Sequence, residues 1–498
     1  MRIVATHKSY TLSFGHMHSI REHLLSWLLL LLSLTFSFRA VCQTSPVFSY
    51  STVAEQKILQ ALNTRLEHDL KALTGPNKKY LSEIYKERFA MIETRVKAKE
   101  VLTDVKAQEY LNALTKEIFR NNTKINKEEL RIHFSRIHWP NASSMGEGTI
   151  LFNIGLFGRL ENESQAAFVL CHEIAHFFLN HSNNNINGYV NTVYSDSFQQ
   201  QLKNIKKTGY GQNNQLEDLS KRLLFKNRHH SREFEQSADS MAMELMKNTG
   251  FSCAEALNCL AILDSVDKEK YGPADVSKAF SFPAFSFKKQ WLQSDDLIFS
   301  SSEDEETRTR REKDSLKTHP ACSTRIARLT PVVNGIQNTG KKFLVSESYF
   351  VQLQKAFDYE EIAYCIELNM VSRALFLSLQ MLETSPRDAF LTATVGKCLN
   401  QVFSYQKKHE LNKIVDLPNP QYDSAYNDLL RLLQNLRLQE IAALSYYYLR
   451  QHEEALSDDE NFVAALIRSK ENFGMQLEAE QWKKHYNTKF PSGSYSFK

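Results

Sequence analysis

The chain has 498 residues, of which 42% are hydrophobic and 24% are charged, and its formal net charge is +4. This composition is ordinary for a globular protein, and the length allows two or three domains. No basic stripe is interleaved with aromatic residues, so nothing indicates nucleic-acid binding. The seven cysteines include no C-x-x-C pair, so their spacing predicts neither a disulfide framework nor cysteine ligands for zinc.

The N-terminal residues have the pattern of an export signal. Arg21 and His23 precede an apolar run at 24–38, and small residues follow it up to Cys42. These features are typical of a secretory signal peptide, so we expect residues 1–42 to be removed from an exported protein. An uncleaved anchor, a lipidated Cys42 and a start at Met17 remain alternatives. No later stretch is apolar enough to span a bilayer, so we expect membrane association to be peripheral at most.

Helical and extended patterns alternate over the next part of the chain. Apolar residues at helical spacing predict three helices within a shoulder at residues 43–128. Apolar and polar residues alternate from 130 to 134, which predicts a strand that bends before residue 140. The residues at 149–152 predict a second strand, and those at 141–148 predict a turn between the two strands. We expect this small sheet directly before a helix that begins near Asn162. An edge strand at such a place can pair with an extended peptide through main-chain hydrogen bonds.

The predicted helix carries the motif His172-Glu173-Ile174-Ala175-His176. Residues four apart lie on one helical face, so His172 and His176 can bind a single metal ion. Two neutral imidazoles suit zinc, and Glu173 can face a water molecule held in an open coordination position. The flanking residues are almost all apolar, and burying these polar groups without partners is costly. We therefore expect one zinc ion per chain.

A zinc site of this kind needs a third protein ligand. The metzincin pattern requires glycine and histidine three and six residues after His176, where this chain has leucine and serine. A glutamate from a later helix is the remaining common solution. Glu235 and Asp239 are one helical turn apart, so Glu235 can bind the ion while Asp239 orients an imidazole. Glu233 is the rival ligand, but it points elsewhere on the helix. The polar insertion at 182–230 predicts a lid or cleft rim.

The order of these motifs resembles the HtpX-like and CAAX-prenyl-endopeptidase-like family of gluzincin metallopeptidases. The resemblance covers about residues 100–332 and rests on Asn141-Ala142, 148–155, Glu163–His181, 231–239 and 318–329. It implies a mainly α (α+β) zincin-like core and a zinc endopeptidase with the ligands His172, His176 and Glu235 and the catalytic glutamate Glu173. The chain is similar to the exported branch, with its BepA-type periplasmic protease, in which a TPR domain follows the catalytic domain.

Three further residues near the motifs have predicted roles. The resemblance places His319 near the metal, as a latch or as a donor to the oxyanion; the alternative is a capping residue before the helix that carries Arg325. We expect Arg325 to be a structural ion-pair partner. His181 follows His176 by five residues and should fall away from the ligand face of a continuous helix, as a packing or outer contact residue.

The remaining residues predict a second, helical domain. The peptidase domain is expected at 129–332, and the helical domain at 345–498. Ala374 and Ala479 each precede a proline by twelve residues, a spacing that resembles TPR second helices, although a plain helical bundle is the alternative. An aromatic segment at 272–299 could cover either the cleft or the helical domain.

These features predict a zinc-dependent endopeptidase that acts on misfolded or misassembled envelope proteins. Zinc would polarise the scissile carbonyl and acidify its bound water, and Glu173 would take the proton. The expected partners are protein or peptide substrates, together with envelope-assembly proteins bound by the helical domain. The alternative is a chaperone-like binding protein with a latched zinc site and little proteolysis. The intact Glu173 favours the enzyme.

Overall fold

The computed structural model describes residues 48–207, 219, 232–265, 270–293, 322–336, 340–420 and 422–497. The predicted signal peptide lies outside these residues. The described part of the chain is mainly helical with one small sheet, which confirms the predicted fold class. None of the helices described is both long and apolar enough to cross a membrane.

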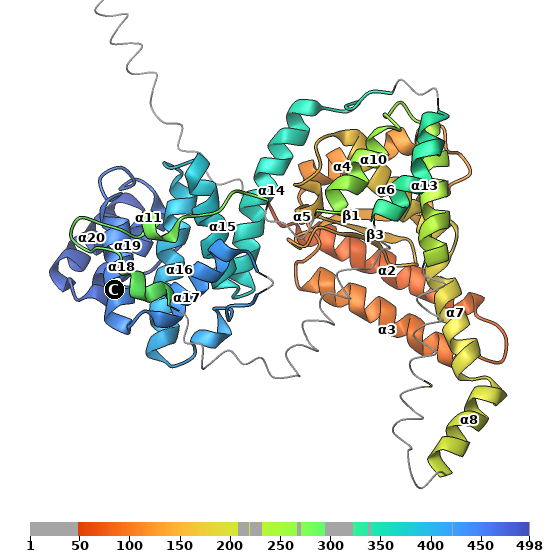
Figure 1. The fold of residues 1–498 in the computed structure, drawn as a ribbon, viewed down its shortest axis with the longest axis horizontal. Coiled ribbons are helices and arrows are strands. Elements are labelled where there is room, and N and C mark those ends of the chain that lie inside the picture. Colours follow the sequence, from red (N-terminus) through yellow and green to blue (C-terminus); the bar gives the residue numbers. More distant parts are fainter. Residues whose placement is uncertain are drawn as a thin grey trace, which may run out of the picture. The chain divides into compact units, whose positions relative to one another are not determined.

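The N-terminal shoulder is helical, as the apolar periodicity predicts (Figure 1). The side chain of Ser51 accepts a hydrogen bond from the backbone N–H of Ala54, and Asp104 does the same for Ala107; each thereby caps a helix N-terminus. The helices of this part are α2 (Thr52–Ala72), α3 (Lys78–Lys97) and α4 (Val105–Arg120), followed by the short η1 (Lys127–Glu129).

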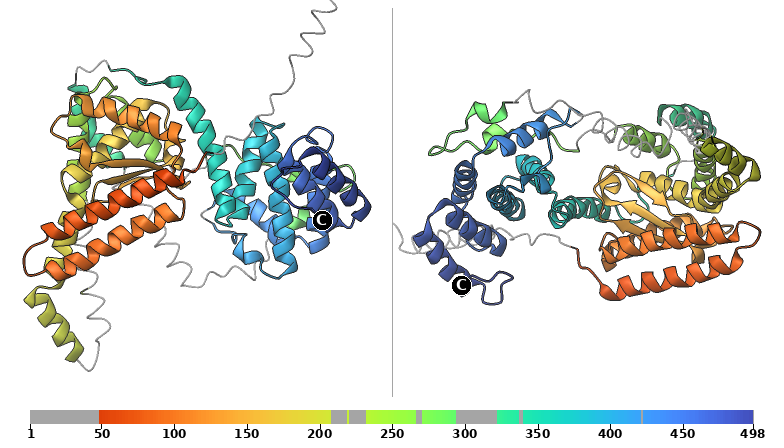
Figure 2. Two further views of the ribbon diagram at one scale, coloured as in Figure 1. Left: turned by 180° about the vertical axis from the view of Figure 1, so that it is seen from behind. Right: turned by 90° about the horizontal axis from the view of Figure 1, so that it is seen from below.

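The sheet has three strands in the order β1-β3-β2: β1 (Arg131–Ser135), β2 (Ala142–Ser144) and β3 (Thr149–Asn153). β1 runs parallel to β3, and β2 runs antiparallel to it. The central strand β3 is apolar at its three middle positions and buried throughout, because helices cover both of its faces (Figures 1 and 2). Leu151 packs with α2 and α3, whereas Ile150 and Phe152 belong to the core around α4 and α6.

Two sequence-based expectations about the sheet are wrong. Residues 142–144 were expected within a turn but form the edge strand β2, which packs against α6. The Ala-Ser-Ser sequence of β2 has no apolar alternation, so only its pairing with β3 reveals it as a strand. In addition, β1 ends at Ser135 and does not continue towards residue 139. The edge strand beside the metal-motif helix is therefore β2, and the predicted strand at 149–152 is central.

Helix α6 (Glu163–Phe178) carries the metal motif and begins at its predicted cap. The side chain of Asn162 accepts a hydrogen bond from the N–H of Gln165 at 3.1 Å. The short α5 (Ile154–Phe157) precedes α6, and α7 (His181–Val193) and α8 (Asp196–Lys207) follow it. The insertion predicted at 182–230 therefore starts as helix. Residues 232–247 are helical again, and α10 (Glu255–Leu263) and α13 (Cys322–Asn334) complete this core.

The N-terminus of α6 is held by a buried carboxylate. The Glu163 side chain accepts hydrogen bonds from the backbone N–H groups of Leu344, Val345 and Ser346 at 2.6, 2.7 and 2.7 Å. It also accepts one from the hydroxyl of Tyr110 at 2.6 Å. A negative charge at a helix N-terminus is favourable, and here it also fixes the chain that leads into α14.

A second hydrophobic core holds the C-terminal helices. Ala374 in α15 and Ala479 in α20 are fully buried, and each of these helices ends just before a proline. The helices are α14 (Glu347–Glu367), α15 (Val371–Thr384), α16 (Ala389–Lys407), η3 (Leu411–Lys413), α17 (Ser424–Asn435), α18 (Leu438–Arg450), α19 (Glu460–Phe473) and α20 (Gln476–Lys489).

The aromatic segment before α13 packs in this second core. Phe280 contacts Tyr448, and Phe285 stacks on Tyr447 with ring centroids 5.6 Å apart. Trp291 is buried, and its indole N–H donates to Glu440 of α18. Of the two expected positions for this segment, the structure shows the one on the C-terminal helices. It contains α11 (Val276–Ala279) and η2 (Lys289–Leu292).

Candidate metal centre

The two motif histidines and Glu235 meet at one buried point. The Nε2 atoms of His172 and His176 are 3.0 Å apart. The Glu235 carboxylate, from the helix at 232–247, lies 3.4 Å from Nε2 of His172 and 3.3 Å from Nε2 of His176. One ligand atom from each of the three residues can be chosen so that all lie within 4.8 Å of one another.

This group fits a zinc ion. Ligand atoms about 2.0–2.2 Å from a tetrahedral zinc lie roughly 3.3–3.6 Å from one another. Each imidazole Nε2 has one Glu235 oxygen near this range, Oε2 at 3.4 Å for His172 and Oε1 at 3.3 Å for His176, and the two imidazole nitrogens are slightly closer to each other. Two imidazoles and one carboxylate are also the protein ligands of a catalytic zinc site with an open fourth position. The side chains of His172, His176 and Glu235 would hold the ion.

His172 is oriented by a carboxylate that an arginine holds in turn. Oδ1 of Asp239 lies 3.0 Å from Nδ1 of His172. Arg325 of α13 donates from Nη2 to Oδ1 of Asp239 at 2.6 Å and from Nε to Oδ2 at 2.8 Å. Burial favours a higher pKa for Asp239, but hydrogen bonds from Arg325 and His172 hold this pKa at about 2. Asp239 is therefore ionised at neutral pH and can accept the Nδ1 proton, which leaves Nε2 for a metal.

The comparison with known families agrees with this geometry. Residues 105–333, slightly less than half of the chain, match the model of peptidase family M48. This match supports the assignment of the matched region to the M48 metallopeptidase family. It spans the three candidate ligands as well as Glu173 and Asp239. No curated protein matches the sequence. Peptidases of family M48 are zinc-dependent, in agreement with the fit of the three side chains to zinc.

Glu173, the glutamate of this M48-like motif, lies beside the candidate ligands. It is 4% exposed and lines a cavity of about 30 Å³, together with His172, with Ala142 at the start of β2 and with the preceding Asn141. A cavity of this size has room for about one or two water molecules. The edge strand and the glutamate of the motif thus border the same space.

The structure separates the two candidates for the third ligand. Glu233 is exposed, whereas Glu235 is buried and belongs to the ligand group. The ion pair of Arg325 with Asp239 gives Arg325 the structural role that the sequence indicates. His319 lies outside the described residues, so its latch or oxyanion role stays a prediction. The six cysteines of the described chain are buried, and none of them belongs to the ligand group.

His181 has the packing and outer-contact role that the sequence predicts, but the predicted direction of its side chain is wrong. His181 does not fall away from the ligands: its Nδ1 lies 3.0 Å from Nδ1 of His176. α6 ends at Phe178, and Asn180 adopts a left-handed conformation with φ of 56°, so the chain turns back before α7. Asparagine shortly after an apolar helix is a known signal for such an ending, and it was the one available clue.

Proposed function

We propose that this chain is a zinc-dependent endopeptidase of the gluzincin type. The observation that carries the proposal is the group formed by the buried His172 and Glu235 and the partly buried His176, with Glu173 beside it. When bound, zinc would polarise a carbonyl and supply a water of lowered pKa. A binding protein would not need a further carboxylate at this place, whereas hydrolysis requires a base.

The side chains have distinct proposed roles. Glu173 accepts a proton from the attacking water and passes it to the leaving amine. Asp239 fixes the tautomer and orientation of His172 through their 3.0 Å contact. His319 is proposed to act near the ion, as a latch or as a donor to the oxyanion. Its replacement by alanine separates these two roles, because loss of a latch raises the rate of cleavage and loss of a donor lowers it.

Extended substrate is proposed to bind along β2. This strand is at the edge of the sheet and packs against α6, and its first residue borders the cavity that Glu173 lines. Main-chain hydrogen bonds to an edge strand do not depend on side-chain identity, which suits a peptidase that acts on many unfolded sequences.

The proposed place of action is outside the cytoplasm, in a periplasmic or similar space. The sequence of residues 1–42 supports export. We propose misfolded or misassembled envelope proteins as substrates, as for the BepA-type proteases that the chain resembles. The C-terminal helices are proposed to be TPR-like and to bind envelope-assembly proteins; the buried Ala374 and Ala479 at matching places in α15 and α20 support this.

Hydrolysis of casein with and without a chelator tests the proposed activity. The purified protein is expected to cleave casein, to lose this activity when the metal is removed, and to regain it when zinc is added. Calcium or magnesium should not restore it, because the imidazole ligands suit zinc. Binding of unfolded casein without cleavage by the zinc-loaded protein would instead favour the chaperone-like alternative.

A further inference from the structure

We propose that His181 is a positioning residue for the metal ligand His176. It belongs to a hydrogen-bonded chain, His176–His181–Ser237, that joins the two helices supplying the metal ligands. The inference rests on the proposed metal site but not on catalysis at that site. His176 would thus be oriented by a second histidine, whereas His172 is oriented by the carboxylate of Asp239.

The distances allow a consistent arrangement of protons along this chain. If Nε2 of His176 binds the metal, its Nδ1 carries the proton and donates to Nδ1 of His181 at 3.0 Å. The remaining proton of a neutral His181 is then on Nε2, 3.1 Å from Oγ of Ser237. The Ser237 hydroxyl donates to the backbone carbonyl of Phe234 at 3.0 Å. Each donor meets an acceptor, so His181 fixes the tautomer of His176 that a metal needs.

His181 is itself held in place. It is 5% exposed, and its ring stacks on Phe234 with centroids 4.4 Å apart and an interplanar angle of 18°. Phe234 and Ser237 flank Glu235 on the helix at 232–247. His181 therefore contacts the ligand His176 of α6 and the helix that supplies Glu235. This contact fixes the relative position of both ligand-bearing helices independently of the metal.

The turn before His181 makes this contact possible. Residue 181 of a continuous helix would be rotated by roughly 140° from residue 176 and would point away from it. The left-handed Asn180, with φ of 56° and ψ of 32°, interrupts the helix instead. Asparagine adopts this conformation more readily than most residues. α7 then begins at His181 itself, in a direction that returns its side chain to α6.

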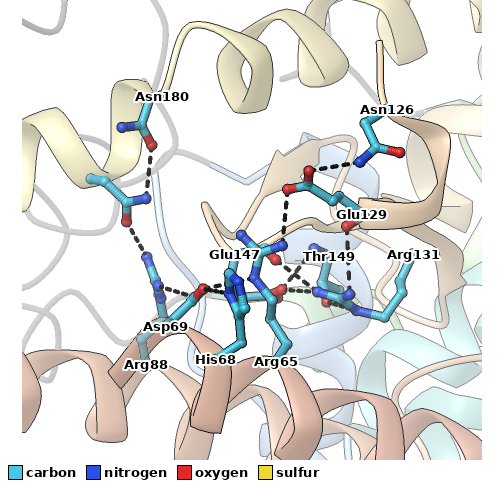
Figure 3. A network of polar contacts seen from close by, with 11 residues as sticks. Arg65, His68, Asp69, Arg88, Asn126, Glu129, Arg131, Glu147, Thr149 and Asn180 are labelled. Atoms are coloured by element: carbon cyan, nitrogen blue, oxygen red, sulfur yellow. Dashed lines mark hydrogen bonds and ion pairs between the residues drawn. The ribbon is translucent and has the colours of Figure 1, made fainter. Parts of the chain in front are cut away.

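The N-terminal helices support the same turn (Figure 3). The side-chain carbonyl of Asn180 accepts a hydrogen bond from Asn183 at 2.7 Å, and the carbonyl of Asn183 accepts one from Arg88 of α3 at 2.8 Å. Asp69 of α2 lies 3.7 Å from the Arg88 guanidinium. A chain of polar contacts thus runs from α2 and α3 to Asn180, the residue before His181. Through this chain the N-terminal helices would help to position His176.

Two substitutions of His181 separate positioning from general packing. The side-chain oxygen of asparagine lies close to the place of histidine Nδ1, and that of glutamine close to the place of Nε2. His181→Asn should therefore keep an acceptor for His176, whereas His181→Gln should keep only the contact with Ser237. We expect zinc binding, measured by competition with a chelator, to be about 10–100-fold weaker for His181→Gln and close to wild type for His181→Asn.

Cobalt spectra and a matched pair of serine variants complete the test. The absorption bands of bound Co²⁺ should shift in His181→Gln and stay in place in His181→Asn. Ser237→Ala should weaken zinc binding, whereas Ser240→Ala should not, because the exposed Ser240 hydroxyl contacts only the carbonyl of Gln236 among the described residues. Equal zinc affinity for all four variants and the wild type would overturn the proposal, as would equal weakening by asparagine and glutamine.

The same measurements distinguish this inference from the proposed function. Zinc affinity and Co²⁺ spectra do not depend on peptide cleavage. A wild-type protein that binds zinc but hydrolyses nothing would contradict the peptidase while leaving the role of His181 intact. Conversely, active His181→Gln protein with wild-type zinc affinity would overturn the positioning role alone. Thermal unfolding of each metal-free variant identifies any that fails to fold, and Ser237→Ala then carries the test because Ser237 is only partly buried.

Discussion

Replacement of Glu173 by glutamine is expected to abolish proteolysis while leaving zinc bound. Glutamine has nearly the same volume, so it fits the buried position of Glu173, but it cannot accept a proton from water. A general base at this place contributes about 10²–10⁴-fold to the rate. Glu173 is not part of the ligand group of His172, His176 and Glu235, so the metal should remain. Initial rates of casein cleavage and the zinc content of the same sample provide the measurement.

Glu244→Gln is a matched control for this experiment. Glu244 is an exposed glutamate on the helix that carries Glu235, and it pairs with Lys247 at 2.7 Å. Its substitution should change neither the rate nor the zinc content, because an exposed ion pair contributes little. Glu173→Gln protein with a rate within tenfold of wild type would refute the assigned base. Loss of zinc from that variant would instead indicate that Glu173 supports the ligands.

Replacement of Glu163 by alanine is expected to be the most destabilising substitution in the peptidase core. The carboxylate is fully buried and accepts hydrogen bonds from the N–H groups of 344–346 and from the hydroxyl of Tyr110. The Tyr110 hydroxyl is buried and the three backbone donors are partly buried, and a fully buried donor left without a partner costs about 1–3 kcal/mol. We therefore expect the free energy of unfolding to fall by at least about 3 kcal/mol. Urea unfolding followed by far-ultraviolet circular dichroism measures it.

The neighbouring Glu161 offers a control for this loss of stability. Glu161 is exposed just before α6, and its carboxylate accepts one long hydrogen bond, 3.4 Å from the side chain of Gln165. Glu161→Ala should change the free energy of unfolding by no more than about 0.5 kcal/mol. If Glu163→Ala and Glu161→Ala unfold at the same urea concentration, the buried carboxylate of Glu163 does not anchor α6.

Local patterns made much of the fold and site predictable. Helix α6 could be placed because Asn162 caps it and because the spacing of His172 and His176 belongs to one helical face. Glu235 and Asp239 followed from the requirement for a third ligand and from their separation of one turn. Each of these inferences depends on residues close together in the sequence, where periodicity and capping are informative.

Features set by distant contacts could not be predicted in this way. The edge strand β2 has no strand pattern of its own and is formed by pairing with β3. His181 reaches His176 only because Asn180 interrupts the helix. Helical periodicity alone would point the His181 side chain away from His176. The aromatic segment around Trp291 is apolar enough for either core, so its packing on the C-terminal helices depends on partners more than 100 residues away.

The most direct test of the central claim is the zinc content of the purified protein by elemental analysis. We expect about one zinc ion per chain in the wild type and little in Glu235→Ala or His172→Ala, because a site that keeps two ligands binds zinc weakly. Glu233→Ala should keep the ion, because its carboxylate is exposed and lies outside the ligand group. Undiminished zinc in Glu235→Ala, or its loss from Glu233→Ala, would contradict the proposed metal centre.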